Sequence, residues 1–342
     1  MGLMGLAESA AGWPAELNEV FERSLTVEFG SLTRSRKPVT VPVSPYIGAV
    51  RRTLDVSTGL TVPAKADRAR ANPKVCLLYA DPIGEGMSDL PVVLVQGHAA
   101  VRDTDLQRNM DRYVELSGSK YPAAVKGVPK MVMGRLVYYY ARIWIEVTPL
   151  RVRWWLNREL DGEPNEWRAP PDTILPPSDP YPVGDPPPPW RPPPSDWQPV
   201  ARYALDHLGL RDLSTVDTDG YPVCLPVTLS ALEDDKLEVQ FGSGAPKLLA
   251  GPACLSFHSH AQIFTGQENR TFVGRYSPNA QGGLFRIERA LGDWSSPGNR
   301  LQVAQAFLGK APKLAPRLKA EAARRGQPVP RVRVGRSGSR SR

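Results

Sequence analysis

Hydroxyl and basic side chains gather in one short stretch early in the chain. Ser57 and Thr58 end an apolar segment, and Lys65 and Arg68 follow shortly after it. Hydroxyl groups and cations are the donors that proteins use to bind phosphate groups. Ser57, Thr58 and Lys65 are therefore suitable phosphate ligands, to which Arg68 and Arg70 could add, but their spacing alone favours a solvated loop.

Two histidines form a second group with possible chemistry. His258 and His260 are two residues apart on an expected strand, on the same face as Cys254. Cys254 and His258 would lie about 13 Å apart along that strand, too far to share one ion. We predict packing roles for these residues and no metal site, and keep haem binding through either histidine as an alternative.

No other pattern in the sequence identifies a catalytic group. The chain contains no glycine-rich phosphate loop, nucleophile elbow or zinc-ligand spacing. The pairs Asp219-Gly220 and Asp234-Asp235 are typical of turns. The catalytic residues therefore stay unknown at this stage.

Charge and cysteine content narrow the class of protein. The net charge of +8 is carried entirely by residues 316–342, which hold nine Lys or Arg and one Glu. This composition predicts a flexible basic tail and no specific nucleic-acid partner. Three scattered cysteines predict a reducing, cytoplasmic location, and no apolar run is long enough to predict a membrane partner.

A proline-rich segment divides the chain. Residues 164–194 hold 14 of the 36 prolines, which favours an extended spacer. Trp167, Trp190 and Trp197 interrupt the segment, so we expect parts of it to lie against a domain surface.

The sequences on the two sides of this segment repeat each other in order. Residues 38–44 correspond to 222–228 at an offset of 184, and residues 54–59 correspond to 237–242. Further matches follow in sequence: Lys65 with Lys247, residues 75–79 with 254–258, Gly97 with Gly274, and residues 141–146 with 285–288. An ordered series of this kind indicates a duplication. Short strands with few helices predict a small antiparallel barrel for each copy.

The first copy resembles the flavin-binding split β-barrels related to pyridoxamine 5′-phosphate oxidase. The motif on which the resemblance rests begins with Ser57-Thr58 at the end of a strand. Lys65 follows, and Asn72-Pro73 comes seven residues after Lys65. Residues 92–101 and 142–155 resemble two barrel strands of that family. The resemblance covers residues 14–156 well and residues 197–294 less closely.

The resemblance implies a cofactor and a place for it. It implies FMN, with Ser57, Thr58, Lys65, Arg68 and Asn72 as binding residues, held where two barrels meet. The implied activity is a flavin-dependent oxidoreductase with a small-molecule substrate; deazaflavin F420 and haem are alternative cofactors. The two copies would form a pseudo-dimer within the chain, and a homodimer stays open.

The sequence also departs from that family. Pro63-Ala64 stands where the oxidase has a Ser-Arg pair. No segment of this chain matches the C-terminal segment with which the oxidase binds its substrate. In the second copy Gln240-Phe241 and Gly251 replace the hydroxyl pair and the asparagine. We therefore expect one working site per chain and no pyridoxamine phosphate oxidase activity. A non-catalytic tandem-barrel scaffold is the rival interpretation.

The expected fold class is mainly β with flanking helices (α+β), as two tandem antiparallel split β-barrels. The predicted divisions are a first barrel at residues 1–161, a proline-rich linker at 162–196, a second, degenerate barrel at 197–315 and the basic tail at 316–342.

Overall fold

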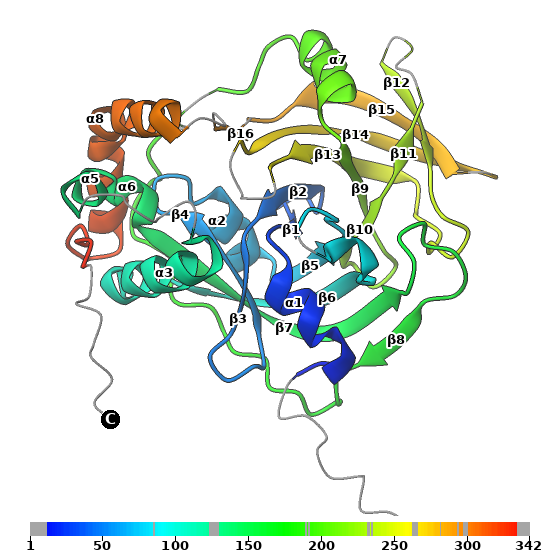
Figure 1. Ribbon diagram of the computed structural model, residues 1–342, viewed down its shortest axis with the longest axis horizontal. Coiled ribbons are helices and arrows are strands. Elements are labelled where there is room, and N and C mark those ends of the chain that lie inside the picture. The colour runs from blue at the N-terminus through cyan, green and yellow to red at the C-terminus, as the bar shows by residue number, and fades with distance from the viewer. Residues whose placement is uncertain are drawn as a thin grey trace, which may run out of the picture.

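Two curled antiparallel sheets make up most of the molecule (Figure 1). This computed structural model describes residues 12–84, 86–122, 130–188, 190, 192–230, 233, 235–261, 266–280, 282–292, 294–296 and 300–333. The first sheet has the order β2-β1-β5-β6-β7-β4-β3, with β8 paired to β7. Its strands are β1 (Val27–Leu32), β2 (Pro38–Val43), β3 (Pro45–Ile47), β4 (Leu54–Gly59), β5 (Lys74–Tyr79), β6 (Val92–Arg102), β7 (Arg142–Trp155) and β8 (Asn165–Arg168).

The second sheet repeats this topology. Its order is β10-β9-β13-β14-β15-β12-β11, with β16 paired to β14. Its strands are β9 (Leu210–Val216), β10 (Pro222–Pro226), β11 (Thr228–Leu229), β12 (Lys236–Gln240), β13 (Gly251–Ser259), β14 (Glu268–Asn279), β15 (Gly282–Ala290) and β16 (Trp294–Ser295). The seven main strands of each sheet stand in the same spatial order, as the predicted tandem duplication of split barrels requires.

Strand register refines the alignment of the two copies. Gly30 pairs with Thr40 in the first copy and Ser214 with Cys224 in the second, both at the offset of 184. In β5 and β13, however, the register aligns Cys76 with Cys254, an offset of 178. The sequence alignment of residues 75–79 with 254–258 was therefore wrong by one residue. A slip of one residue exchanges the two faces of a strand.

Strand pairing confirms that Gly97 and Gly274 are equivalent positions of the two copies. The pairing shifts between Gln96 and Gly97 in β6, and between Val273 and Gly274 in β14. A side chain at either glycine would press into the neighbouring strand, because an added Cβ at Gly97 would lie 2.5 Å from the carbonyl oxygen of Thr148. Both copies thus carry the same bulge at the same place.

The apolar run of β5 is explained by burial on both of its faces. Val75, Leu77 and Tyr79 belong to the core of the first barrel. Cys76 and Leu78, which alternate with them, belong to the core of the second barrel. Successive strand residues point to opposite faces, so an interior strand between two barrels must be apolar throughout.

The helices lie mainly around the first barrel (Figure 1). They are α1 (Asn18–Arg23), α2 (Ala64–Ala71), α3 (Leu106–Lys120), α5 (Lys130–Arg135), α6 (Val137–Tyr140), α7 (Gln198–His207) and α8 (Arg300–Arg324). The segment around Lys65, expected to be a loop, is the helix α2, consistent with its high content of alanine and arginine. Asp105 caps α3 by accepting a hydrogen bond from the backbone N–H of Arg108.

The predicted basic tail was wrong in its first part. The expected boundary at residue 316 falls inside α8, which runs through Pro312 and Pro316. Phe307, Leu314 and Leu318 of this helix join the core of the first barrel. Burial of a large apolar side chain contributes about 1.5–3 kcal/mol, which offsets roughly 3 kcal/mol per interior proline. Residues 334–342 of the expected tail lie outside the described residues.

The linker is held against the first barrel. Asp179 Oδ2 accepts hydrogen bonds from the backbone N–H groups of Asp103 and Thr104, at 2.7 and 2.9 Å. Trp167 and Trp190 pack on the core of the first barrel, as their positions in the sequence predicted. The linker is therefore bound to the surface of the first barrel, and we call it the strap.

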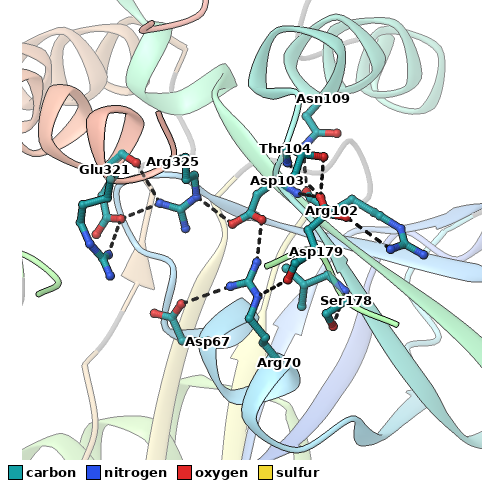
Figure 2. Close-up of polar contacts among 12 residues, drawn as sticks. Asp67, Arg70, Arg102, Asp103, Thr104, Asn109, Ser178, Asp179, Glu321 and Arg325 are labelled. Atoms are coloured by element: carbon teal, nitrogen blue, oxygen red, sulfur yellow. Dashed lines mark hydrogen bonds and ion pairs between the residues drawn. The ribbon is translucent and has the colours of Figure 1, made fainter. Parts of the chain in front are cut away.

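The strap and the C-terminal helix converge on one buried ion-pair network (Figure 2). Asp103 accepts hydrogen bonds from Arg70 at 2.6 Å and from Arg325 at 2.7 Å, and all three side chains are 2% exposed. Arg325 also binds Glu321, whose side chain is fully buried. The network joins α2, the end of β6 and α8.

The two barrels pack directly against each other. Strand β2 of the first lies on β13 and β14 of the second, and β10 of the second lies on β5 and β6 of the first. Gln96 Nε2 donates across this junction to Asp217 at 2.8 Å, and Thr40 is hydrogen-bonded to Ser214. The contact is reciprocal because β2 and β10 are equivalent strands. Among the described residues, no helix is long and apolar enough to cross a membrane.

Candidate cofactor site

Three basic side chains meet where β4 ends, α2 begins and β7 begins. Lys65 lies in the first turn of α2, Arg68 one turn later, and Arg142 opens β7 opposite Gly59. We call Lys65, Arg68 and Arg142 the cation cluster. Burial, followed by repulsion from Arg68 and Arg142, lowers the pKa of Lys65 to about 8. Arg68 and Arg142 are therefore both close enough to Lys65 for their charges to act on it.

No carboxylate forms a salt bridge with the cation cluster within the part of the chain that the structure describes, and the nearby charge of Asp67 acts on Arg68 alone. Lys65 makes no hydrogen bond or salt bridge there, and neither arginine has a salt bridge. Closely packed cations without an acidic partner are unfavourable unless an anion binds among them. The arrangement therefore suits an anionic ligand.

Arg68 connects the cluster to the second barrel. Its Nε donates to Ser31 Oγ at 2.9 Å, and burial lowers its pKa to about 10. Cys254 of β13 is close enough to influence that pKa. The cation cluster thus lies close to the junction of the two barrels, as the family resemblance implied for the cofactor.

Arg142 is held by aromatic side chains, and no sequence pattern marked it as a site residue. Its guanidinium carbon lies 4.0 Å above the ring of Tyr113 and 4.7 Å from that of Tyr139. One guanidinium nitrogen donates to the Tyr113 hydroxyl at 2.7 Å, while the buried Nε has no hydrogen bond within the described residues. The orphaned Nε is a donor that a bound anion would satisfy.

The structure places the other expected ligands, Ser57, Thr58 and Asn72, at different positions around α2. Thr58 Oγ1 donates to the carbonyl of Val62 at 2.9 Å and so closes the turn that leads into α2. Ser57 precedes it on β4, and therefore points to the opposite face of that strand. Asn72 follows the far end of α2 and accepts a hydrogen bond from the Lys74 backbone N–H at 3.1 Å. The structure thus brings Lys65 and Arg68 together, but not Asn72.

Arg70 does not contribute to the cluster. It points to the other side of α2, where Asp103 and Asp67 bind it (Figure 2). Its charge is neutralised there, so it holds the strap and α8 in place.

The equivalent place in the second copy is blocked. No helix corresponds to α2 between β12 and β13, and Lys247 is exposed in the connecting loop. A Cβ at Gly242 would lie 1.7 Å from the carbonyl oxygen of Glu159, and one at Gly244 would lie 1.6 Å from that of Gly162. The segment that leaves the first barrel therefore fills this place.

The two histidines lie between the barrels and both contact acids of the first copy. His258 Nδ1 is 2.8 Å from Glu28 Oε1, and His260 Nε2 is 2.5 Å from Asp81 Oδ2. The two acids are far from the histidines in sequence, so the sequence offered no sign of them. Cys254 instead contacts Thr40, with 3.3 Å between the backbone nitrogen and the sulfur.

Comparisons with known proteins give similarities of fold. No family model matches the chain, and no curated protein matches it. A solved structure similar to it is a protein related to general stress protein 26 of B. subtilis (pyridoxinephosphate oxidase family), from Clostridium acetobutylicum. The identity is 14% and the TM-score 0.32, over 45% of this chain and 92% of that one.

Two further solved structures are similar over about the same share of the chain. An F420 reductase has 14% identity and a TM-score of 0.31, over 41% of this chain and 98% of that one. A pyridoxamine 5′-phosphate oxidase-related, FMN binding protein from Nostoc punctiforme has 11% identity and a TM-score of 0.28, over 41% and 78%. With its two sheets of identical strand order, the chain is similar in fold to pyridoxamine phosphate oxidase-like split β-barrels, present as two tandem copies.

Proposed function

We propose that the chain is an FMN-dependent oxidoreductase that binds one FMN in its first barrel, beside the junction with the second. The observation that carries this proposal is the cation cluster, in which Lys65, Arg68 and Arg142 lie near one another with no salt bridge to a carboxylate among the described residues. A phosphate monoester carries between one and two negative charges at neutral pH and offers several acceptor oxygens. It would neutralise the cluster and accept from the orphaned Nε of Arg142.

The residues of the chain would bind and orient the cofactor. Lys65 and Arg68 project from one face of α2, because they are three residues apart on a helix. Ser31 holds the Arg68 guanidinium in place, and Tyr113 and Tyr139 hold that of Arg142. FMN, when bound, supplies the hydride or electron transfer, so no side-chain acid or base is required to explain the chemistry.

The second barrel would form a wall of the site and carry no cofactor of its own. The absence of a helix after β12 and the close approach of Glu159 and Gly162 support this assignment. The proposed stoichiometry is one FMN per chain. The substrate is a small molecule whose identity we leave open.

The visible spectrum of the purified full chain tests this proposal. We expect a yellow protein with flavin absorption, and release by heat of a compound with the mass of FMN. Release of F420 or haem would replace the cofactor assignment. A colourless protein that takes up none of these three would contradict an oxidoreductase role and favour the non-catalytic scaffold.

A further inference from the structure

A cavity of about 190 Å³ lies where the two barrels meet. Glu28 from β1, Asp212 from β9 and His258 from β13 line it, and none of the three belongs to the cation cluster. Pockets for drug-sized organic ligands usually enclose about 300–1,000 Å³. A cavity of this volume is better suited to an ion with its water molecules.

Glu28 and His258 are buried without aligned hydrogen bonds. Their side chains are 3% and 5% exposed, and the contact of 2.8 Å between them brings two charged groups together. Beyond this mutual contact, Glu28 Oε2 and His258 Nε2 lack a hydrogen bond within the described residues. Buried polar groups are almost always hydrogen-bonded, so such a set indicates a missing partner.

The other charged groups around the cavity are already engaged. Arg158 and Arg211 donate to backbone carbonyl groups. Asp81 accepts from Thr26 and lies 2.5 Å from a ring nitrogen of His260. The charge of Arg158 acts on Asp212, but among the described residues neither arginine forms a salt bridge with a carboxylate of the cavity.

The duplication explains how two carboxylates came to face each other. The β1–β2 and β9–β10 registers place Glu28 and Asp212 at equivalent positions of the two copies. His258 corresponds to Ala80 by the offset in β5 and β13, so the histidine is present on one side alone. The result is a set of two oxygen ligands and one nitrogen ligand.

We propose that Glu28, Asp212 and His258 bind one Zn²⁺ ion that clamps the two barrels together. Their ligand atoms all lie within 4.8 Å of one another. Bonds from zinc to carboxylate oxygen or imidazole nitrogen are about 2.0–2.2 Å long, so the three groups draw together slightly, and water completes the tetrahedron. The proposal is independent of the cofactor assigned above, because it involves other residues and a different measurement.

Equilibrium dialysis of the full chain against Zn²⁺, after removal of metals with a chelator, tests the clamp. We expect one ion per chain and a higher melting temperature with Zn²⁺. Glu28→Gln and His258→Ala should each weaken binding at least tenfold. The matched control, His207→Ala, changes an exposed histidine on α7 and should leave binding unchanged.

Zn²⁺ binding to the wild-type chain tests the proposal even where a variant fails to fold. Absence of a stoichiometric ion in the wild-type protein would overturn the proposal. Equal affinity in the wild type and in a folded Glu28→Gln variant would overturn it as well.

Discussion

At the residue scale, the proposed chemistry depends on three cations that reach one place from two distant parts of the chain. Lys65 and Arg68 share one face of α2, and Arg142 joins them because β7 pairs with β4. The pairing places Arg142 directly opposite Gly59, and the Arg142 guanidinium lies 3.8 Å from where a Gly59 Cβ would be. A larger residue there would crowd the guanidinium group.

The lowered pKa of Lys65 predicts how ligand affinity depends on pH. In the ligand-free protein this amine loses its proton at about pH 8, so it is charged below that value and neutral above it. Binding of a phosphate above pH 8 must therefore take up a proton. We expect FMN affinity to fall by up to about tenfold between pH 7 and pH 9, as measured by fluorescence titration.

Lys65→Arg is the matched control for that pH dependence. Arginine stays charged over this range, so the variant should bind FMN with a nearly constant affinity from pH 7 to pH 9. A wild-type affinity that does not change with pH, or a fall of the same size in both proteins, would show that Lys65 does not contact the phosphate.

Only part of the site could be predicted from the sequence. Lys65 and Arg68 stand in the same short stretch, and the resemblance to a flavin-binding family selected them, because their spacing alone fits a solvated loop equally. Arg142 and the orphaned Nε could not be found, because strand pairing alone brings that residue to β4. Glu28 and Asp212 were missed for the same reason, since they meet only when the two barrels pack together.

At the element scale, α8 does more than end the second copy. It crosses to the first barrel, where its apolar side chains complete the core and Arg325 reaches Asp103 (Figure 2). From the sequence we expected a flexible basic tail from residue 316. Net charge dominated that prediction, whereas the buried face of the helix, with Leu318 and Ala322, decides the structure.

Asp103→Ala should strongly destabilise the protein. The change leaves Arg70 and Arg325 buried without their shared carboxylate, and breaking a buried ion pair in this way costs about 3–5 kcal/mol. Thermal unfolding followed by circular dichroism measures the effect. Asp111→Ala is the matched control, because Asp111 is 36% exposed and lies 3.7 Å from Arg333.

The control should cost less than about 1 kcal/mol, as exposed ion pairs do. Similar losses in the two variants would mean that the network in Figure 2 does not secure α8 and the strap.

At the scale of the whole molecule, the duplication determines the architecture, and the differences between the two copies underlie the proposed function. The repeat in the sequence was sufficient to predict two barrels of one topology, and the strand orders confirm it. The one-residue error in aligning β5 with β13 arose because loops of different length hide the register. The first copy retains α2 and its cations, whereas the second presents Lys247 to solvent.

The comparison of two lysine variants tests this asymmetry most directly. Lys65→Ala removes a cation of the cluster, and Lys247→Ala removes the lysine that corresponds to it in the second copy. Loss of one charge-assisted contact to phosphate costs about 1.5–3 kcal/mol, or roughly 10- to 150-fold in affinity. FMN titration of both folded variants should show a loss of that size for Lys65→Ala and no change for Lys247→Ala. Equal effects, or unchanged affinity in Lys65→Ala, would contradict a single flavin site in the first barrel.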